Sequence, residues 1–488
     1  MSLSAALEAI RRAPEGPGVG AFFDFDGTLI DGYSAEALYS HRLRHFEIGL
    51  NELVHTVRSM AGPTLTEEQF GELLGRGVAG WSGRPVADID ELGARLFSQS
   101  IAGALSHEMW SLVKAHQRQG HTVVIATSAT RFQVAPLARE LEVDHIVCSE
   151  LEEEGGLLTG RVVGRPSWGA GKAAAVVTFA EAADIRLVDS FAYANGAEDV
   201  PFLACVGRPC AVNAQRELAE YARRHGWPEL SLRRGPGRLD PKPALRTAAM
   251  YGALAGSGVA GIAVGALTGS RRRGIDLATT LFAHLGSALG DVDVSVIGEA
   301  NLWARRPAVF LVNHQSSLID LLVTTTILRG GFTAVAKKEA AAIPVFGRLM
   351  AMADFAFIDR ADPGQAHRAL AEAAQRLADG ISIVISPEGT RSLTPRVGQF
   401  KKGAFHLAMQ AGVPIVPIVI RNAGELMWRN AKTVRSGTVE VVVLDLIPTV
   451  GWTKADLDRS VEQVRRLYAE TLAHWPESAP STGSEAQR

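Results

Sequence analysis

The sequence predicts an α/β protein, in which two units with their own strands and helices are joined by an apolar helical segment. At roughly 150 residues per domain, the chain of 488 residues has room for about three domains, or for two plus an appendage. Short apolar runs that end in polar residues recur in both halves, as the strands of a parallel sheet do. Between the halves, residues 247–270 carry no charge.

Composition narrows the class of protein further. Hydrophobic residues make up 47% and charged residues 21% of the chain, which excludes intrinsic disorder as its main state. The formal net charge of -2 gives no general reason to expect nucleic acid as a partner. The three cysteines, Cys148, Cys205 and Cys210, are too few for a disulfide framework and favour a reducing, cytoplasmic setting. Residues 1–20 lack the sustained apolar stretch of a secretory signal.

The first expected strand is the apolar run Val19–Phe25, which places two aspartates on one face. Because side chains alternate along a strand, Asp24 and Asp26 point the same way. Two neighbouring carboxylates repel each other unless they share a cation, and Mg²⁺ prefers such oxygen ligands. An isolated D-x-D pair would more simply cap the next helix, so the polar residues later in the chain decide between the two interpretations.

Further polar residues come after the later strands or lie in a turn near them. We expect the same sheet to contain the apolar runs Thr122–Ala126, Ile185–Val188 and Phe191–Tyr193. The polar residues at their C-terminal ends, or in the glycine-rich turn SWGAGK, are Thr127, Ser128, Lys172, Asn195 and Asp199. Since the sites of parallel sheets lie at the C-terminal ends of the strands, these groups are expected to meet.

The combined set suits hydrolysis of a phosphate ester. One carboxylate attacks phosphorus to form a phospho-aspartate, and the other transfers the proton. A hydroxyl and an ammonium group hold the phosphate oxygens, and a metal ion neutralises the remaining charge.

The motifs DFDGTL, ATSAT, GK and ANGAEDVPFL resemble those of the haloacid dehalogenase superfamily, in its phosphoserine-phosphatase-like branch, over roughly residues 15–230. The resemblance implies a Rossmann-like parallel sheet in which Asp24 is the nucleophile and Asp26 the general acid and base. It implies that Thr127 and Lys172 bind the substrate phosphate. The Mg²⁺ ligands that it implies are Asp24, Asp26, Asn195 and Asp199.

Two further features of this sequence bear on the resemblance. Asn195 stands where the acidic motif G-D-x-x-x-D usually has its first acid, and an amide oxygen can bind Mg²⁺ but adds no charge. The 103 residues from Asp24 to Thr127 far exceed the roughly 30 of a strand–helix–strand unit. The resemblance implies a helical cap there, at about residues 33–105. Within it, Thr66–Gln69 forms a capping-box pattern, which predicts the start of a helix.

A second strand-to-helix junction holds a histidine and an aspartate. The apolar run Ala308–Val312 is an expected strand, and Ser316 or Ser317 is a good N-cap for the next helix. His314 would then lie on the turn and Asp320 in the first helical turn, where they can meet. A histidine oriented by a carboxylate is a general base for a hydroxyl, although a lone histidine is often structural. No serine or cysteine nucleophile motif accompanies it, so direct attack by a substrate hydroxyl is the simpler scheme.

The motifs NHQSSLID, FIDR, PEGTRS and VPIVPIVI occur in the order found in glycerolipid acyltransferases, and they resemble most the 1-acyl-glycerol-3-phosphate acyltransferases, over roughly residues 290–475. Two more strands are expected, Ile381–Ser386 and Val413–Ile420. The resemblance implies an α/β domain with His314 as base and Asp320 as its partner, although the usual H-x4-D spacing is one residue longer here. The acceptor-site residues that it implies are Lys338, Arg360, Glu388, Gly389, Thr390 and Arg391. The donor would be an acyl thioester of coenzyme A or acyl carrier protein, and the acceptor lysophosphatidate or a related phosphorylated compound.

The uncharged segment Thr247–Ser270 and the amphipathic run Ile275–Leu289 are expected to form a helical hairpin at a membrane surface. The 24 residues of the uncharged segment would span about 36 Å as a helix, enough for a bilayer core of about 30 Å. However, alanine and glycine are only weakly hydrophobic, and arginines flank the segment on both sides, against the positive-inside rule. Small residues allow the two helices of a hairpin to pack closely. Because a hairpin returns the chain to the same side, both predicted sites would stay on the cytoplasmic face of the cell membrane. A true span and a soluble buried helix are the alternatives.

These expectations divide the chain into a phosphatase-like domain (1–232), a linker (233–243), membrane-associated helices (244–290), an acyltransferase-like domain (291–475) and a disordered tail (476–488). The leading hypothesis is a bifunctional enzyme that acylates lysophosphatidate to phosphatidate and hydrolyses a phosphomonoester with Mg²⁺. Alternatively, only the acyltransferase is active, and the N-terminal domain is a weakly active or inactive module that binds a phosphorylated ligand. A non-enzymatic membrane scaffold would leave both sets of residues unexplained.

Overall fold

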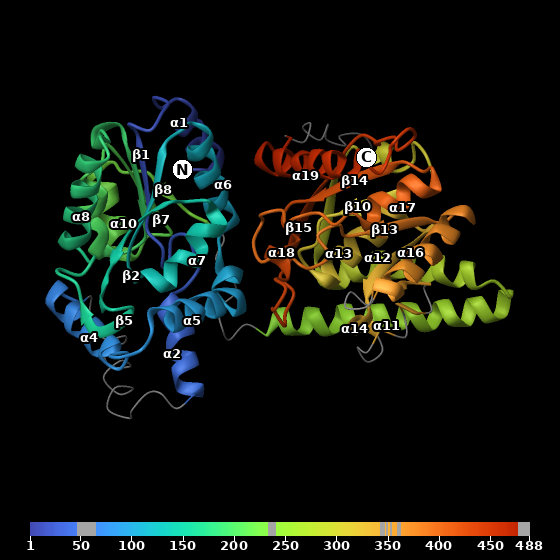
Figure 1. Cartoon of the computed structure of the whole chain (residues 1–488), viewed down its shortest axis with the longest axis horizontal. Helices are drawn as coiled ribbons and strands as arrows, with labels where there is room; N and C mark the ends of the chain where they lie inside the picture. Colours follow the sequence, from blue (N-terminus) through green and yellow to red (C-terminus); the bar gives the residue numbers. More distant parts are fainter. Residues whose placement is uncertain are drawn as a thin grey trace, which may run out of the picture. The chain divides into compact units, whose positions relative to one another are not determined.

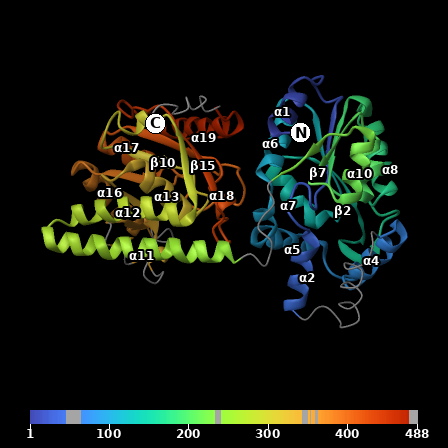
Figure 2. The same cartoon turned by 180° about the vertical axis from the view of Figure 1, so that it is seen from behind.

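The computed structural model describes residues 1–45, 65–232, 241–341, 347, 350–351, 354–358 and 363–476. The chain divides into two compact units, residues 1–235 and 236–488. Each unit contains a large, mainly parallel sheet covered by helices (Figures 1 and 2). The predicted α/β fold with a parallel N-terminal sheet is therefore confirmed. Most of the predicted linker and of the predicted tail lies outside the described residues.

The sheet of the first unit has six parallel strands in the order β3-β2-β1-β6-β7-β8. The strands are β1 (Gly20–Phe23), β2 (Thr122–Thr130), β3 (His145–Ser149), β6 (Phe191–Ala194), β7 (Arg208–Val212) and β8 (Glu229–Leu230). Strand β1 is buried along its whole length, as expected for an apolar central strand. Phe23 pairs with Ile125 on one side and Tyr193 on the other, so the residues after these three positions lie at the same edge of the sheet.

Helices surround this sheet and also form the insertion between β1 and β2. Helix α6 (His107–Arg118) ends the insertion and leads into β2. The helices outside the insertion are α1 (Leu3–Arg11), α7 (Arg131–Leu141), α8 (Ala170–Ala182), α9 (Val200–Ala204) and α10 (Arg216–His225). The described helices in the region of the predicted cap are α2 (Ser34–Arg44), α4 (Glu67–Ala79), α5 (Val86–Gln99) and the 3-10 turn η1 (Ile101–Ala104), while residues 46–64 lie outside the described ranges. A small antiparallel hairpin consists of β4 (Leu151–Glu154) and β5 (Leu157–Val162). The capping box at Thr66 is confirmed, since Thr66 Oγ1 accepts from the Gln69 N–H at 3.3 Å and Gln69 Oε1 accepts from the Thr66 N–H at 2.9 Å.

Two local predictions in this unit are wrong. The run Ile185–Val188 is not a strand, because the chain forms the 3-10 turn η2 (Leu187–Asp189) and leaves the Val188 side chain 75% exposed. Ser190 holds this turn: its hydroxyl donates to the Arg186 carbonyl at 2.7 Å and accepts from a β1 backbone N–H at 2.8 Å. Lys172 does not lie in the glycine-rich turn but in the first turn of α8, directly after it.

Two histidines and a tyrosine form a buried chain of hydrogen bonds inside this unit. His121 Nε2 lies 2.9 Å from the Pro14 carbonyl, which can only accept, so this nitrogen carries the proton. His121 Nδ1 then accepts from His116 Nδ1 at 2.8 Å, and His116 Nε2 accepts from the Tyr193 hydroxyl at 2.9 Å. Burial lowers the pKa of both histidines, that of His116 well below its ordinary value of 6.5.

The contribution of His116 to the stability of the first unit is therefore expected to shrink in acid, while the raised pKa of Asp26, about 7, acts in the opposite direction. The unfolded chain binds a proton on His116 below about pH 6.5 and the folded chain does not, so stability is lost as pH falls from 6.5 toward the lowered pKa. The loss should reach about 1.4 kcal/mol per pH unit for His116 alone. Thermal unfolding between pH 7.5 and 5 measures it as the difference in pH dependence between wild type and His116→Gln, and the exposed His225→Gln should behave as wild type. An unchanged slope in His116→Gln would contradict this assignment.

The sheet of the second unit has seven strands in the order β12-β11-β13-β10-β14-β15-β9. They are β9 (Val292–Ile297), β10 (Val309–Val312), β11 (Phe332–Lys337), β12 (Ala356–Ile358), β13 (Ser382–Ile385), β14 (Ile415–Ile420) and β15 (Gly437–Val443). All neighbouring pairs are parallel except β14 with β15. The strands expected at 308–312, 381–386 and 413–420 are confirmed as β10, β13 and β14.

Helices and two apolar cores complete this unit. The helices are α13 (Ser317–Leu328), α14 (Lys338–Ala341), α16 (Pro363–Ala378), α17 (Gly403–Ala411), α18 (Ala423–Leu426) and α19 (Leu457–Ala473). Phe310 and Leu311, successive residues of β10, belong to different core clusters. The sheet is therefore buried on both faces, which explains why its central strands are continuous apolar runs.

Two long helices, α11 (Lys242–Thr268) and α12 (Arg271–Gly290), form the expected hairpin (Figures 1 and 2). They touch where glycines face each other. A Cβ on Gly261 would lie 2.5 Å from the Gly274 carbonyl oxygen, and one on Gly274 would lie 2.3 Å from that of Gly261. The small residues noted in the sequence thus bring the two backbones into direct contact.

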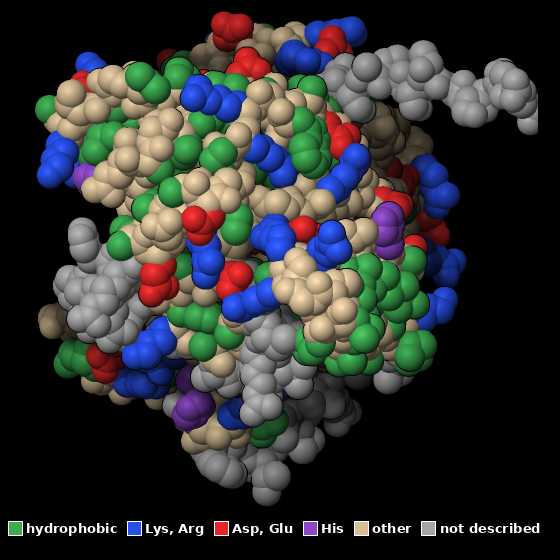
Figure 3. Space-filling view, turned by 90° about the vertical axis from the view of Figure 1, so that its right-hand side faces the viewer, with side chains coloured by type: hydrophobic (Ala, Val, Ile, Leu, Met, Phe, Trp, Pro, Cys, Tyr) green, Lys and Arg blue, Asp and Glu red, His purple; other side chains and the backbone are tan. Residues whose placement is uncertain are grey.

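Much of the outer surface of the hairpin is apolar. Within the described part of the chain, α11 is the one helix long and apolar enough to cross a membrane, and 28% of its most apolar window is buried. Exposed apolar side chains lie along both helices, at Leu245, Tyr251, Val259, Ile262, Leu267, Leu285 and Leu289. In Figure 3 hydrophobic side chains gather at the lower right, with lysines and arginines beside them. A low buried fraction disfavours the soluble buried helix among the three alternatives.

Candidate active sites

The first candidate site lies at the edge of the N-terminal sheet, where β1 ends. Asp24 is 5% exposed, and its Oδ1 accepts from Lys172 Nζ at 2.7 Å. The same ammonium donates to Asp199 Oδ1 at 2.9 Å. Burial alone would lower the pKa of Lys172, but Asp199 and Asp24 outweigh it and keep the pKa above its ordinary value, so the ammonium stays charged.

Thr28 joins Asp24 to Asn195. Its hydroxyl oxygen lies 3.0 Å from Asp24 Oδ2 and 3.2 Å from Asn195 Oδ1, so one proton faces two acceptors. Gly27 has a φ of +75°, and a Cβ there would fall 2.3 Å from Asn195 Nδ2. The glycine of the DFDGTL motif is therefore needed for Asn195 to approach Asp24.

Asp26 faces the beginning of α2 and not the lysine. Its Oδ1 accepts from the Ser34 N–H at 2.6 Å and its Oδ2 from the Ser34 hydroxyl at 3.1 Å, while Gln133 Nε2 donates to that hydroxyl at 3.0 Å. Burial raises the pKa of Asp26 to about 7, the hydrogen bonds from Ser34 oppose the rise, and the charge of Asp24 adds to it. A carboxyl group that is half protonated near neutral pH can both give and take a proton.

Two of the four predicted Mg²⁺ ligands meet at one hydroxyl, and a third, Asp199, shares Lys172 with Asp24. Asp24 Oδ2 and Asn195 Oδ1 converge on the Thr28 hydroxyl, and Mg²⁺ prefers oxygen donors of this kind. The carboxylates of Asp26 and Asp199 are engaged in the contacts above. In the part of the chain that the structure describes, no group of three or more His, Cys, Asp or Glu side chains could hold a metal ion. The donors fit a cation held by one charged and one neutral oxygen from the protein, with substrate and water completing its shell.

Thr127, the predicted phosphate-binding hydroxyl, lies near the C-terminal end of β2. It is fully buried, and its Oγ1 accepts from the Ala129 N–H at 3.0 Å. The register of β1 and β2 places Asp24 level with Ala126, one residue before Thr127. The sheet thus brings this hydroxyl to the same edge as Asp24.

The second candidate site lies between β10 and α13. His314 Nδ1 lies 2.7 Å from Asp320 Oδ2, which also accepts from the backbone N–H groups of Gln315 and Ser316 at 2.9 Å each. Asp320 is buried, while part of the His314 side chain reaches the surface. A carboxylate on Nδ1 holds the proton there and leaves Nε2 as the basic nitrogen.

The additional residue between histidine and aspartate is absorbed by the start of α13. Ser316 is the N-cap with an extended backbone, but its side chain makes no capping hydrogen bond. Asp320 takes that role by accepting the N–H groups before the helix. The longer spacing therefore still brings Asp320 to His314.

Glu388 supports the His314 turn from the next loop. Its carboxylate is buried and accepts from the His314 N–H at 3.0 Å, the Ser392 hydroxyl at 2.8 Å and the Gly398 N–H at 2.8 Å. Burial raises its pKa, and these hydrogen bonds oppose the rise. Gly389 comes next, with a φ of +74° in the turn. Glu388 thus holds the histidine loop in place, and its part in the acceptor site stays a prediction.

The predicted basic residues differ in their placement. Arg391 lies directly before Ser392, whose N–H donates to the His314 carbonyl at 2.7 Å, so it is next to the histidine. Lys338 begins α14 after β11, Thr390 is exposed, and Arg360 lies outside the described residues.

Sequence reasoning missed several residues of both sites. Thr28 lies within the DFDGTL motif, so the sequence does contain a signal for its hydroxyl. Ser34 holds Asp26, and Gln133 donates to Ser34. Gln133 lies in the capping box of α7, directly after β2, but that pattern does not connect it to Asp26. Arg429 is also absent from the predicted set, although it contacts the backbone of Arg391.

Comparisons with known proteins match two separate parts of the chain. Residues 21–204 match the family model of haloacid dehalogenase-like hydrolases, and residues 293–421 match the acyltransferase model. An uncharacterized acyltransferase of Schizosaccharomyces pombe is 38% identical over 204 residues, 41% of this chain and 73% of that protein. The 1-acyl-sn-glycerol-3-phosphate acyltransferase of Saccharomyces cerevisiae is 33% identical over 234 residues, 47% of this chain and 77% of that protein. The crystal structure of the 1-acyl-sn-glycerophosphate acyltransferase of Thermotoga maritima aligns with a TM-score of 0.42 and 25% identity, over 48% of this chain and 98% of that one.

Proposed function

Since the chain belongs to the family of the 1-acyl-sn-glycerol-3-phosphate acyltransferases and joins to it a haloacid dehalogenase-like hydrolase domain, we propose that it is a bifunctional enzyme of glycerolipid synthesis. Its C-terminal unit transfers an acyl chain from a thioester to the free hydroxyl of lysophosphatidate. Its N-terminal unit hydrolyses a phosphomonoester. The observation that supports acyl transfer best is the 2.7 Å contact between His314 Nδ1 and Asp320.

In the proposed acyl transfer, His314 acts as a general base. Its Nε2 removes the proton of the acceptor hydroxyl as the oxygen attacks the thioester carbonyl carbon. Asp320 stabilises the imidazolium that forms, and the histidine then returns the proton to the departing thiolate. The new ester bond replaces the carbon–sulfur bond, and a free thiol leaves.

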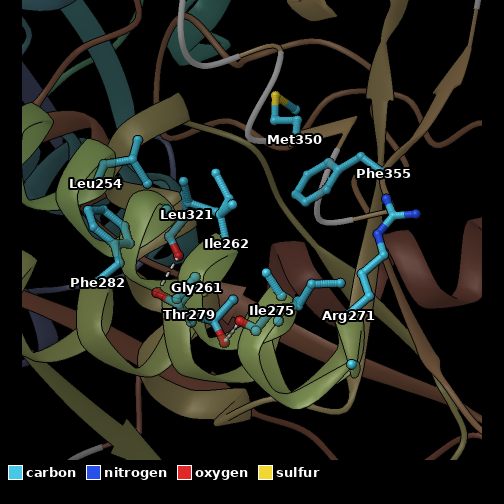
Figure 4. A pocket seen from close by; sticks show the side chains of 17 residues that line it. Leu254, Gly261, Ile262, Arg271, Ile275, Thr279, Phe282, Leu321, Met350 and Phe355 are labelled. Carbon is cyan, nitrogen blue, oxygen red and sulfur yellow. Dashed lines mark hydrogen bonds between the residues drawn. The ribbon is translucent and has the colours of Figure 1, made fainter.

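An apolar groove beside α13 suits the hydrocarbon part of a substrate. It has a volume of about 470 Å³, within the roughly 300–1,000 Å³ of ligand pockets, and it lies between α11, α12 and α13. Figure 4 shows Leu254, Phe282 and Leu321 on one side and Phe355 and Arg271 on the other. Leu321, the residue after Asp320 in α13, is one of the side chains that line this groove.

In the proposed phosphatase, Asp24 attacks phosphorus and Asp26 protonates the leaving oxygen. Lys172 holds phosphate oxygens, and Thr127 is the proposed hydroxyl donor. A Mg²⁺ ion held by Asp24 and Asn195 would neutralise phosphate charge when bound. The raised pKa of Asp26, about 7, suits the proton transfer.

An alternative function for this unit is supported by the contacts of Lys172. Lys172 engages both Asp24 and Asp199 at once, and Asn195 carries no charge, so the cation site has little negative charge. In this alternative the unit binds a phosphorylated ligand without hydrolysing it and regulates the acyltransferase.

Activity measurements on full-length protein in liposomes test both proposals. Lysophosphatidate with acyl-coenzyme A, or with acyl carrier protein thioester, should yield phosphatidate. A panel of phosphomonoesters should release phosphate only with Mg²⁺. If the panel shows no phosphate release, the phosphatase proposal fails and the ligand-binding alternative remains. If no thioester yields phosphatidate, the acyltransferase proposal fails.

Membrane binding through the hairpin should depend on its exposed apolar side chains. We propose that α11 and α12 lie at the cytoplasmic face of the membrane, because Val259 and Leu267 of α11 are 65% and 86% exposed and three arginines begin α12. Replacing both with aspartate should release most of the protein from anionic liposomes in a flotation assay. Val188→Asp, on a side chain 75% exposed in the other unit, is the matched control and should stay bound. Carbonate should extract the wild-type protein, and its retention would favour a true span.

A further inference from the structure

Arg391 and Arg429 reach across to each other beside the His314 site. Arg391 Nη1 donates to the Arg429 carbonyl at 2.7 Å, and Arg429 Nη1 donates to the Arg391 carbonyl at 3.2 Å. A third hydrogen bond joins the same two segments, because Trp428 Nε1 donates to the Leu393 carbonyl at 2.9 Å. These reciprocal bonds hold two cationic side chains together without a carboxylate in either bond.

The two guanidinium groups have N–H donors left over that could bind an anion. A guanidinium group carries five N–H donors, and each of these bonds uses one. In the part of the chain that the structure describes, Arg429 Nε is buried and has no hydrogen-bond partner. Burial first, and then the charge of Arg429, lower the pKa of Arg391, as expected for two neighbouring like charges. A group with several acceptor oxygens and negative charge would satisfy these donors and remove the repulsion.

The position of the pair fits the acceptor better than the donor. Arg391 is next to Ser392, which contacts His314, and it lies within the electrostatic reach of Asp320. In 1-acyl-glycerol-3-phosphate, the free hydroxyl and the phosphate are on adjacent carbons, so a phosphate near Arg391 puts the hydroxyl near the base. The phosphates of a coenzyme A or carrier-protein thioester are many bonds from the thioester carbon.

We propose that Arg429 completes, with Arg391, a two-arginine clamp for the phosphomonoester of the acyl acceptor, and that Arg429 makes the enzyme prefer a phosphorylated acceptor over a neutral one. This proposal rests on acyl transfer at the His314 site. A purely structural Arg429 would only fasten two loops. Its loss would then affect all acceptors alike.

Steady-state kinetics of the full-length protein in liposomes separate these roles. Arg429→Gln should raise the KM for lysophosphatidate by about 10- to 100-fold, the range for a lost hydrogen bond to a charged group. The KM for the acyl thioester and the rate with the phosphate-free monoacylglycerol of the same chain length should stay within about twofold. Arg429→Lys should restore part of the affinity as a single point charge. Lys432→Gln, an exposed cation on the same loop, is the matched control and should behave as wild type.

Other outcomes would overturn the clamp. A rise in the KM of the thioester alone would assign the pair to the donor. Equal losses with both acceptors, together with a lower unfolding temperature, would make Arg429 structural. If wild type transfers no acyl group, the proposed function fails, and calorimetric binding of glycerol 3-phosphate then decides the clamp: Arg429→Gln should weaken it about 10-fold or more, and equal affinity would refute it.

Discussion

Replacing His314 with alanine is expected to lower kcat for acyl transfer by a factor of about 100 to 10,000, because the acceptor hydroxyl loses its general base. The change removes one end of the Asp320 contact, yet Asp320 keeps its two backbone partners, Gln315 and Ser316. The turn before α13 should therefore stay folded. Phosphatidate formation from a radiolabelled thioester measures the loss, and phosphate release by the same preparation should be unchanged.

The exposed His474 gives the matched control within the same unit. His474→Ala should transfer acyl groups at the wild-type rate. If His314→Ala also keeps the wild-type rate, the base assignment is wrong, and another group deprotonates the acceptor. A loss of phosphate release along with acyl transfer would instead indicate that the variant is damaged as a whole.

Asp24→Asn should remove phosphomonoester hydrolysis, by a factor on the order of 1,000 or more, because an amide cannot attack phosphorus to form the phospho-aspartate. Lys172 would keep Asp199 as a charged partner, so the buried ammonium would not be left alone. Release of inorganic phosphate in the presence of Mg²⁺ measures the effect, and acyl transfer should remain intact.

Asp189 provides the control for this change. It pairs with Arg186 at 2.7 Å near the surface of the same unit, and Asp189→Asn should hydrolyse phosphomonoesters as wild type does. Hydrolysis that survives in Asp24→Asn would show that the activity does not pass through a phospho-aspartate at this position.

The strands were predictable wherever burial on both faces requires a continuous apolar run. Strands β10, β13 and β14 are such runs, and each appears within two residues of its expected bounds. Ile185–Val188 has the same composition but is not a strand, because the Ser190 hydroxyl, bonded to the backbone of β1, holds the chain in a turn. The pattern of hydrophobic residues along the sequence gives no sign of that contact.

The sites were predictable where their residues lie directly after a strand. Asp24 and His314 stand at strand ends, and the parallel register brings their neighbours to the same edge. Arg429 lies 38 residues beyond Arg391, in a loop between α18 and β15 with no motif. Only the folded path of that loop brings the two side chains together, so local patterns could not have found the second arginine.

The glycine contact between α11 and α12 has a consequence for how the enzyme meets a lipid. With Gly261 and Gly274 backbone to backbone, the two helices cannot separate or slide without losing their packing, so at a membrane the hairpin would act as one stiff wedge. In the proposed interfacial position, a wedge expands one leaflet and leaves the other unchanged. Insertion would then cost less free energy where that leaflet is loosely packed, so the enzyme would bind preferentially to strongly curved bilayers.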